Sequence, residues 1–215
     1  QRYVQFTKDI LNYQFSLNND KLDSQSRDRI EENIDRLYRD RASLIKKSGR
    51  KIDAFDIIFA ELSSENRILI YGDDLVQLRD FQKKLSSLGQ SFFEYTGDKD
   101  ARKICPIMLQ QFRQGIRKIL LAIGCLDEGI DIPTCDVAIF VCSSTSKRQF
   151  IQRRGRVLRT APRKRKARIY DFLVVPQLDS SASDKERQLA LRMIEAQYQR
   201  INIMIEDALN GLGER

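Results

Sequence analysis

Apolar residues recur at helical spacing through the first sixty residues, and this pattern predicts helices there. Within the segment 24–48 the residues that would share one helix face are Ile30, Ile34, Leu37, Leu44 and Ile45. Ser24 or Ser26 is placed to cap the start of this helix, and Gly49 is placed to end it. Residues 51–64 predict a second, shorter amphipathic helix.

After these helices the pattern changes to short apolar runs that alternate with helical segments. The apolar runs have the length of buried strands and occupy residues 67–71, 91–95, 118–123, 137–142 and 167–175. The helical segments between them cover residues 75–89, 101–115 and roughly 147–158. This alternation predicts an α/β fold whose sheet is largely parallel and is covered by helices on both faces.

A last helix is predicted for residues 183–211. Its apolar stripe consists of Leu189, Met193, Ile194, Ile201, Ile205 and Leu209, and we expect it to pack on the domain or on a partner segment. The chain then has three predicted parts: a helical lead-in over 1–62, an α/β domain over 63–178 and a C-terminal helix over 179–215.

In a sheet of this kind ligands bind beyond the carboxyl ends of the strands, so the loops at those ends are the candidate sites. They read "GDD" at 72–74, "TGDKD" at 96–100, "GCLDEGIDIP" at 124–133 and "SSTSKRQ" at 143–149.

The composition, 41% hydrophobic and 32% charged over 215 residues, is that of a soluble globular protein. No apolar run approaches the roughly 18 residues of a membrane span, and we expect no membrane partner. The N-terminus has neither an initiator Met nor the apolar core of a signal peptide, so we expect residue 1 to be a cut within a longer chain. We expect a cytoplasmic protein, from a bacterium or archaeon.

The four cysteines form no CxxC pair, and the chain contains no histidine. These facts argue against a zinc site and exclude a histidine-based catalytic triad. We expect the thiols of Cys105, Cys125, Cys135 and Cys142 to be small buried groups in a reduced protein.

The net charge of +8 is concentrated late in the chain, where no acidic residue lies between Asp136 and Asp171. Basic residues in this interval are Lys147, Arg148, Arg153, Arg154, Arg156, Arg159, Arg163, Lys164, Arg165, Lys166 and Arg168. Such an asymmetry indicates a polyanionic partner, either nucleic acid or nucleotide phosphate. A solvated basic face is the alternative.

The charge is densest in "QRRGRVLR", residues 152–159. Arg153, Arg156 and Arg159 are three positions apart, so on a helix they lie near one face. An Arg side chain offers a fork of donors to phosphate oxygens, and Gly155 lets a phosphate or another backbone come close.

Two motifs at this spacing resemble a known family. "GCLDEGIDIP" is similar to the fifth motif of superfamily 2 helicases, and "QRRGRVLR" to the sixth, QxxGRxxR. "RILIYG" stands where the fourth motif begins, and residues 95–115 resemble the segment that has Y-x-G and then a helix ending F-x-x-G. The resemblance covers roughly residues 40–175 and implies the C-terminal RecA-like domain of a helicase or translocase. The lead-in at 41–62 is most similar to XPB-like and restriction-type DNA translocases.

By this resemblance, Arg156 and Arg159 would be arginine fingers that reach the γ-phosphate of ATP. Asp131 would contact the ribose, and Gly129 would allow close approach of the backbone; Asp131 as a turn-capping residue is the alternative. Gln152 and Arg153 would complete the ATP site at the interface between two motor domains.

The resemblance also implies a nucleic-acid track. We assign to it Thr96, Gly97, Gly124 and Arg148. An ordinary strand-to-helix turn at Thr96 and Gly97, and a plain helix surface at Arg148, are the alternatives. Ile123 departs from the family, because many relatives carry Thr or Ser there.

The chain contains no phosphate-cradling GxxxxGK[ST] loop and no acidic magnesium motif. We therefore expect ATP and Mg²⁺ to bind at a site shared with a missing N-terminal RecA-like domain of the same chain, which would hold the magnesium, and we expect this fragment alone to be inactive. The predicted function is the C-terminal motor domain of an ATP-dependent DNA helicase or translocase that contacts the nucleic-acid backbone without regard to sequence, with RNA as a possible substrate. The alternatives are an ATP-independent nucleic-acid-binding module and a non-catalytic scaffold domain.

Overall fold

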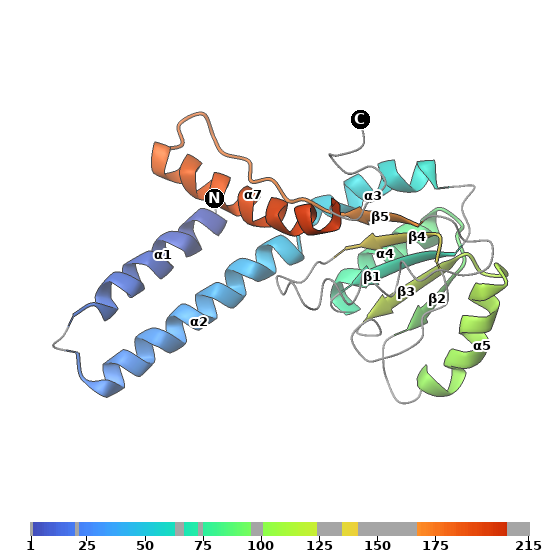
Figure 1. Ribbon diagram of the computed structural model, residues 1–215, viewed down its shortest axis with the longest axis horizontal. Coiled ribbons are helices and arrows are strands. Elements are labelled where there is room, and N and C mark those ends of the chain that lie inside the picture. Colours follow the sequence, from blue (N-terminus) through green and yellow to red (C-terminus); the bar gives the residue numbers. More distant parts are fainter. Residues whose placement is uncertain are drawn as a thin grey trace. The chain divides into compact units, whose positions relative to one another are not determined.

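The computed structural model describes residues 2–19, 22–62, 67–72, 75–95, 101–123, 135–141 and 167–205. They fall into two compact units, and each is described by itself (Figure 1). The helical unit consists of Gln1–Ser48 with Leu173–Arg215, and the sheet unit consists of Gly49–Phe172. The limits given above for the three parts of the chain stay a prediction.

In the helical unit, α1 (Arg2–Leu17) and α2 (Ser24–Lys46) form an antiparallel pair. Ile10, Ile34 and Leu37 are the buried centre of this pair. The predicted cap of α2 was wrong by one residue, because the N-cap is Asp23, whose carboxylate accepts hydrogen bonds from the amide and the hydroxyl of Ser26, both at 2.8 Å. A carboxylate also suits the positive end of the helix dipole better than a hydroxyl does.

The end of α2 also differs from the prediction. The helix stops at Lys46 with Lys47 as its C-cap, and Gly49 is the N-cap of the next helix, α3 (Arg50–Glu61). The second predicted helix, over residues 51–64, is thereby confirmed, with a start one residue earlier and an end at Glu61.

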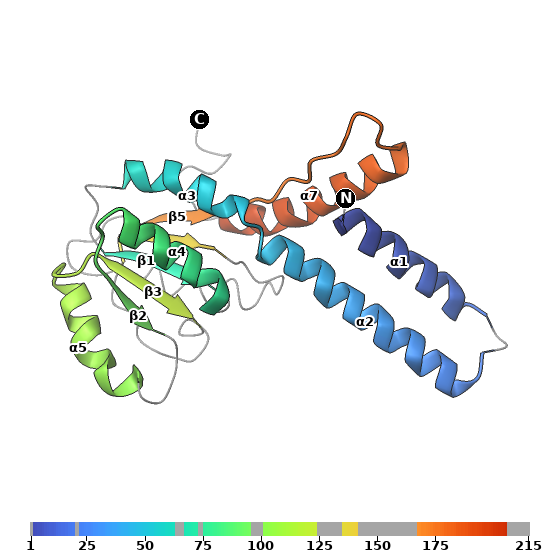
Figure 2. The same ribbon diagram turned by 180° about the vertical axis from the view of Figure 1, so that it is seen from behind.

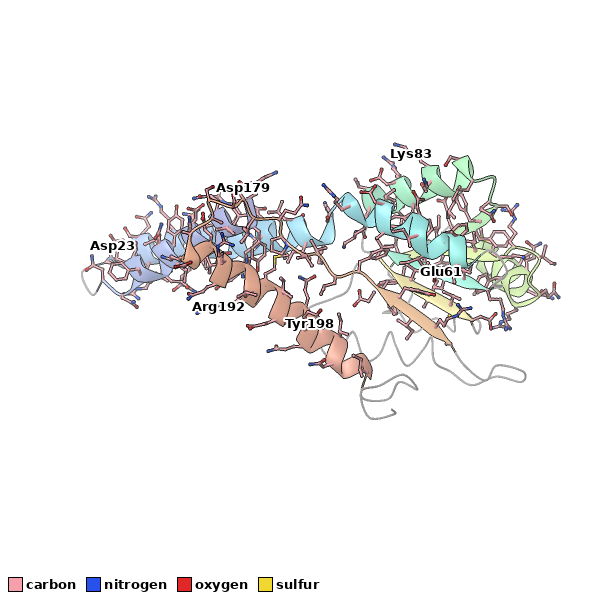
Figure 3. All side chains as sticks on the ribbon, turned by 90° about the horizontal axis from the view of Figure 1, so that it is seen from above. Asp23, Glu61, Lys83, Asp179, Arg192 and Tyr198 are labelled. Atoms are coloured by element: carbon pink, nitrogen blue, oxygen red, sulfur yellow. The ribbon has the colours of Figure 1, made fainter. Side chains whose placement is uncertain are left out.

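The third helix of this unit, α7 (Asp184–Ile205), packs as its apolar stripe predicts, with Leu189 and Met193 buried. Arg192 and Tyr198 lie on its exposed side (Figure 3). An ion pair at 2.9 Å joins Lys8 on α1 to Glu186 on α7. Leu209 of the predicted stripe lies outside the described residues.

The sheet unit contains a five-stranded, fully parallel sheet in the order β2-β3-β1-β4-β5. The strands are β1 (Ile68–Gly72), β2 (Phe92–Tyr95), β3 (Ile119–Ile123), β4 (Val137–Phe140) and β5 (Arg168–Asp171). Each lies within or one residue beyond a predicted apolar run. The three central strands, β3, β1 and β4, are buried and apolar on both faces, as expected for a parallel sheet that is covered on both sides. The edge strands β2 and β5 expose some of their side chains.

Helices cover the two faces of the sheet, as predicted (Figures 1 and 2). On one face α3 and α4 (Leu75–Ser87) pack through Phe55, Phe59, Leu78, Phe81 and Leu85. On the other face α5 (Ala101–Arg113) packs through Phe112, with Met108 and Leu109 beside it. Glu61 marks the end of α3, and the exposed Lys83 lies on α4 (Figure 3). The helix predicted near 147–158 lies outside the described residues.

An Arg–carboxylate fork fixes the amino ends of two neighbouring strands. Arg67, before β1, donates to both carboxylate oxygens of Asp136, before β4, at 2.8 and 2.6 Å. Hydrogen bonding to Asp136 raises the pKa of the Arg67 guanidinium. Arg67 holds this position with a φ of 55°, in the left-handed region that favours glycine.

Cys135 is buried, as predicted, whereas the side chains of Cys105, Cys125 and Cys142 lie outside the described residues. No helix in the described part of the chain is long and apolar enough to cross a membrane.

Candidate functional site

The carboxyl ends of all five strands lie along one edge of the sheet. The register places Tyr71 of β1 beside Ala122 of β3 and Phe140 of β4. The same pairing joins Tyr95 of β2 to Ala122, and Phe140 to Asp171 of β5. Because the strands are parallel and end together, every connection that leaves a strand starts from this edge.

The strand order creates a topological switch point at this edge. From β1 the chain runs through α4 to β2 at one side of the sheet, whereas β4 leads to β5 at the other side. Since β1 and β4 are neighbours, their connections leave in opposite directions. A ligand crevice is expected beyond the carboxyl ends of such a pair.

All ten predicted site residues lie outside the described residues, so their roles stay predictions. They are Thr96, Gly97, Gly124, Gly129, Asp131, Arg148, Gln152, Arg153, Arg156 and Arg159. The described strands do fix which connection carries each of them. Thr96 and Gly97 follow β2, the residues from 124 to 131 belong to the β3–β4 connection, and the rest belong to the β4–β5 connection. All three connections start at the carboxyl edge.

The structure adds Lys51, which the sequence analysis did not single out. Its side chain is buried, and its Nζ donates a hydrogen bond of 2.7 Å to the carbonyl oxygen of Val141, directly after β4. The signal in the sequence was a lysine at a position where the spacing of Phe55 and Phe59 calls for an apolar residue.

Gly72, the last residue of β1, is a second feature of this edge. A Cβ added there would lie 2.8 Å from both Cγ and Cδ2 of Leu78 on α4. The glycine therefore allows α4 to approach the carboxyl end of β1 more closely than any other residue would.

A match to a known protein family identifies the class of domain that contains this sheet. Residues 50–161 match the helicase conserved C-terminal domain. The chain belongs to this family. The predicted resemblance to the C-terminal domain of superfamily 2 helicases is thereby confirmed.

The chain is similar in sequence to two kinds of curated protein. It is 34% identical to the DNA 3'-5' translocase XPB2 of Sulfurisphaera tokodaii over 112 residues, and this alignment covers 52% of the chain and 24% of that protein. It is 40% identical to Dicer-like protein 2 of Cryphonectria parasitica over 65 residues, and this alignment covers 30% of the chain and 4% of that protein. The aligned part thus spans a quarter or less of the length of these relatives.

The fold of the helicase domain also matches a solved structure. The C-terminal part of the Fun30 ATPase domain aligns with a TM-score of 0.50 and 15% identity, over 72% of this chain and 56% of that one. At this identity the likeness bears on the fold alone, and it agrees with the RecA-like fold predicted from the motifs.

The charge of the chain is divided unevenly between its two units. Basic and acidic residues balance in the helical unit, so the net charge of +8 belongs entirely to the sheet unit. Within the described ranges, no group of three or more Cys, Asp or Glu residues is arranged to hold a metal ion. The net positive charge of the sheet unit favours an anionic partner.

Proposed function

We propose that this helicase domain is the C-terminal motor half of an ATP-dependent DNA helicase or translocase. The supporting observation is the carboxyl edge of the sheet, where the three connections that carry all ten motif residues start, the β4–β5 connection at the switch point itself. The match to the helicase family over residues 50–161 supports the same proposal.

On the ATP side, this chain would contribute positive charge and orientation. Arg156 and Arg159 donate to the γ-phosphate and stabilise the charge that builds up during phosphoryl transfer. Asp131 accepts a hydrogen bond from the ribose, beside a close backbone approach at Gly129. ATP bound with Mg²⁺ supplies the phosphoryl group that is transferred to water.

The site would be completed by a second RecA-like domain. The donor set of this chain, rich in guanidinium groups, suits phosphate rather than a metal ion. The 215 residues contain no GxxxxGK[ST] loop. The second domain would therefore supply this loop and the magnesium ligands, and Gln152 and Arg153 would organise the interface with it.

On the nucleic-acid side, Thr96, Gly97, Gly124 and Arg148 would contact the phosphate backbone without reading the bases. The concentration of the net charge of +8 in the sheet unit supports this assignment. DNA is favoured over RNA because the relative that aligns over 112 residues is named a DNA translocase.

The test is ATP hydrolysis by the protein that carries both RecA-like domains, measured with and without duplex DNA. Replacing Arg156 with alanine should lower DNA-stimulated turnover by roughly 10³-fold while ATP still binds, because the arginine acts on charge in the transition state. The matched control is Arg192→Ala, which removes an exposed arginine of α7 and should leave turnover unchanged.

A second candidate, an ATP-independent nucleic-acid-binding module, is favoured by the charge of the sheet unit and by the missing phosphate loop. It predicts that hydrolysis is absent or indifferent to Arg156. In that case Arg156→Ala should instead weaken DNA binding. The slope of the logarithm of affinity against the logarithm of salt concentration should become shallower by about one unit, as expected for the loss of about one phosphate contact.

A further inference from the structure

Lys51 occupies an unusual place on α3. The helix buries three residues at four-residue spacing, Lys51, Phe55 and Phe59, and the other two pack into the core against the sheet. Lys51 is only 6% exposed. Its ammonium group therefore stands where the helix pattern calls for an apolar side chain.

The ammonium group of Lys51 binds the backbone carbonyl group of Val141. The carbonyl oxygen of Val141 accepts the hydrogen bond from Lys51 Nζ at 2.7 Å, and the amide of Val141 donates to the carbonyl oxygen of Tyr71 at 2.9 Å. Both backbone groups of Val141 are thus fixed, one by α3 and the other by β1. Val141 is the first residue after β4, where the chain leaves the sheet.

Stability alone does not account for a lysine at this position. Burying an ammonium group carries a desolvation cost that an apolar residue of similar length avoids. A methionine at position 51 would extend the stripe of Phe55 and Phe59 without that cost. A charged donor does provide a short, directional bond that fixes the orientation of one carbonyl group.

We propose that Lys51 is a positioning residue, which sets the direction in which the β4–β5 connection leaves the sheet. This inference rests on the proposed function, because that connection carries Gln152, Arg153, Arg156 and Arg159. An arginine that stabilises a transition state must be placed accurately, and displacement by about 1 Å can cost about 100-fold in turnover. Lys51 would act through those arginines and would not itself touch ATP.

The test compares Lys51→Met with a matched control, Lys84→Met, in the protein that carries both RecA-like domains. Lys84 is a partly exposed residue of the same unit, and its Nζ forms an ion pair with Asp56 at 2.7 Å. We expect Lys51→Met to lower kcat for DNA-stimulated ATP hydrolysis by about 10- to 100-fold with KM for ATP unchanged. Lys51→Met removes the buried ammonium group but also leaves the buried Val141 carbonyl without this donor, so kcat per folded molecule, and not the melting temperature, is the deciding measurement. Lys84→Met should keep the wild-type kcat.

Combining Lys51→Met with Arg156→Ala separates the two proposals. If Lys51 acts through Arg156 and the other arginines of the connection, the two losses should be less than additive, and the double variant should lose less turnover than the product of the two single losses. If Arg156→Ala is inactive but Lys51→Met keeps the wild-type kcat, the inference about Lys51 is overturned and the proposed function stands. If Arg156→Ala keeps the wild-type turnover, the proposed function fails, and the inference fails with it.

A purely structural role makes different predictions. In that case Lys51→Met should lose melting temperature and folded fraction, while the folded molecules keep their kcat. Should the methionine variant fail to fold, Lys51→Leu is a second apolar substitution that removes the donor to the Val141 carbonyl. It should show the same loss of kcat, and an unchanged kcat in the leucine variant would overturn the inference.

Discussion

Replacing Gly72 with alanine tests how tightly α4 is held against the carboxyl end of β1. The new Cβ would lie 2.8 Å from Cγ and Cδ2 of Leu78, a side chain that is 2% exposed. Carbon atoms in contact normally stay 3.5 to 4.0 Å apart, so Leu78 or its helix must move by about 0.7 Å or more. Overpacking of this kind costs about 1 to 3 kcal/mol, and we expect Gly72→Ala to destabilise the sheet unit by that amount.

Native-state hydrogen exchange at the amides of Leu69 and Ile70 is a suitable measurement, because these buried residues of β1 report on the sheet unit alone. Gly49→Ala is the matched control. Gly49 has helical angles, with φ −63° and ψ −24°, and a Cβ there has no neighbour within 4 Å. We expect the opening free energy to change by no more than about 0.5 kcal/mol in this control.

A double variant identifies the clash directly. Leu78→Ala alone should cost about 2 to 5 kcal/mol because it opens a cavity. In the Gly72→Ala background it should cost at least about 1 kcal/mol less, since the new methyl group then has room. Additive costs, or equal effects of Gly72→Ala and Gly49→Ala, would show that Leu78 does not press on Gly72, and the reasoning would be refuted.

Two further predictions concern charged residues. Arg67→Gly should be more stable than Arg67→Ala by about 1 kcal/mol in urea unfolding, because both lose the fork to Asp136 but only glycine suits a φ of 55°; equal stabilities would contradict this. The pKa of Glu186, lowered to about 2 by hydrogen bonds from Lys8 and from Ser183, predicts a stabilisation that is complete above the ordinary value of 4.5 and is lost as the pH falls toward 2. Acid unfolding followed by circular dichroism should lose this dependence in Glu186→Gln, and an NMR titration of Lys8→Met should show a raised pKa at Glu186.

The sequence predicted the elements of the sheet unit well because each strand is a short apolar run between polar turns. The run at 67–71, for example, became β1 with a shift of one residue at both ends, and the run at 118–123 became β3 with a start one residue later. Helices on both faces followed from the alternation of strands and helices. The order β2-β3-β1-β4-β5 could not be read from the sequence, because strand pairing depends on contacts between distant segments.

Details that depend on tertiary contacts were missed for the same reason. Arg67 adopts a backbone conformation that its residue type rarely takes, and it pairs with the distant Asp136. The cap of α2 is an exception, because Asp23 bonds to Ser26 only three residues away and was missed among several local candidates. Lys51 is polar in the sequence but buried in the fold, where a carbonyl group lies within reach. The candidate site was predicted from motif residues that lie outside the described ranges, so the structure contributes the edge from which their connections start.

The buried sheet and the charged connections have complementary roles if the arginines act as proposed. β4 is buried along its length between β1 and β5, and the carbonyl group after its last residue is held by Lys51. Electrostatic stabilisation of a transition state requires hydrogen-bond donors that are already in place before the charge develops, because the free energy needed to move them into place would offset the stabilisation. A rigid strand end is the simplest support for such donors. The helical unit, whose charges balance, would then add little to the attraction of DNA, and the salt dependence of binding should respond to basic residues of the sheet unit.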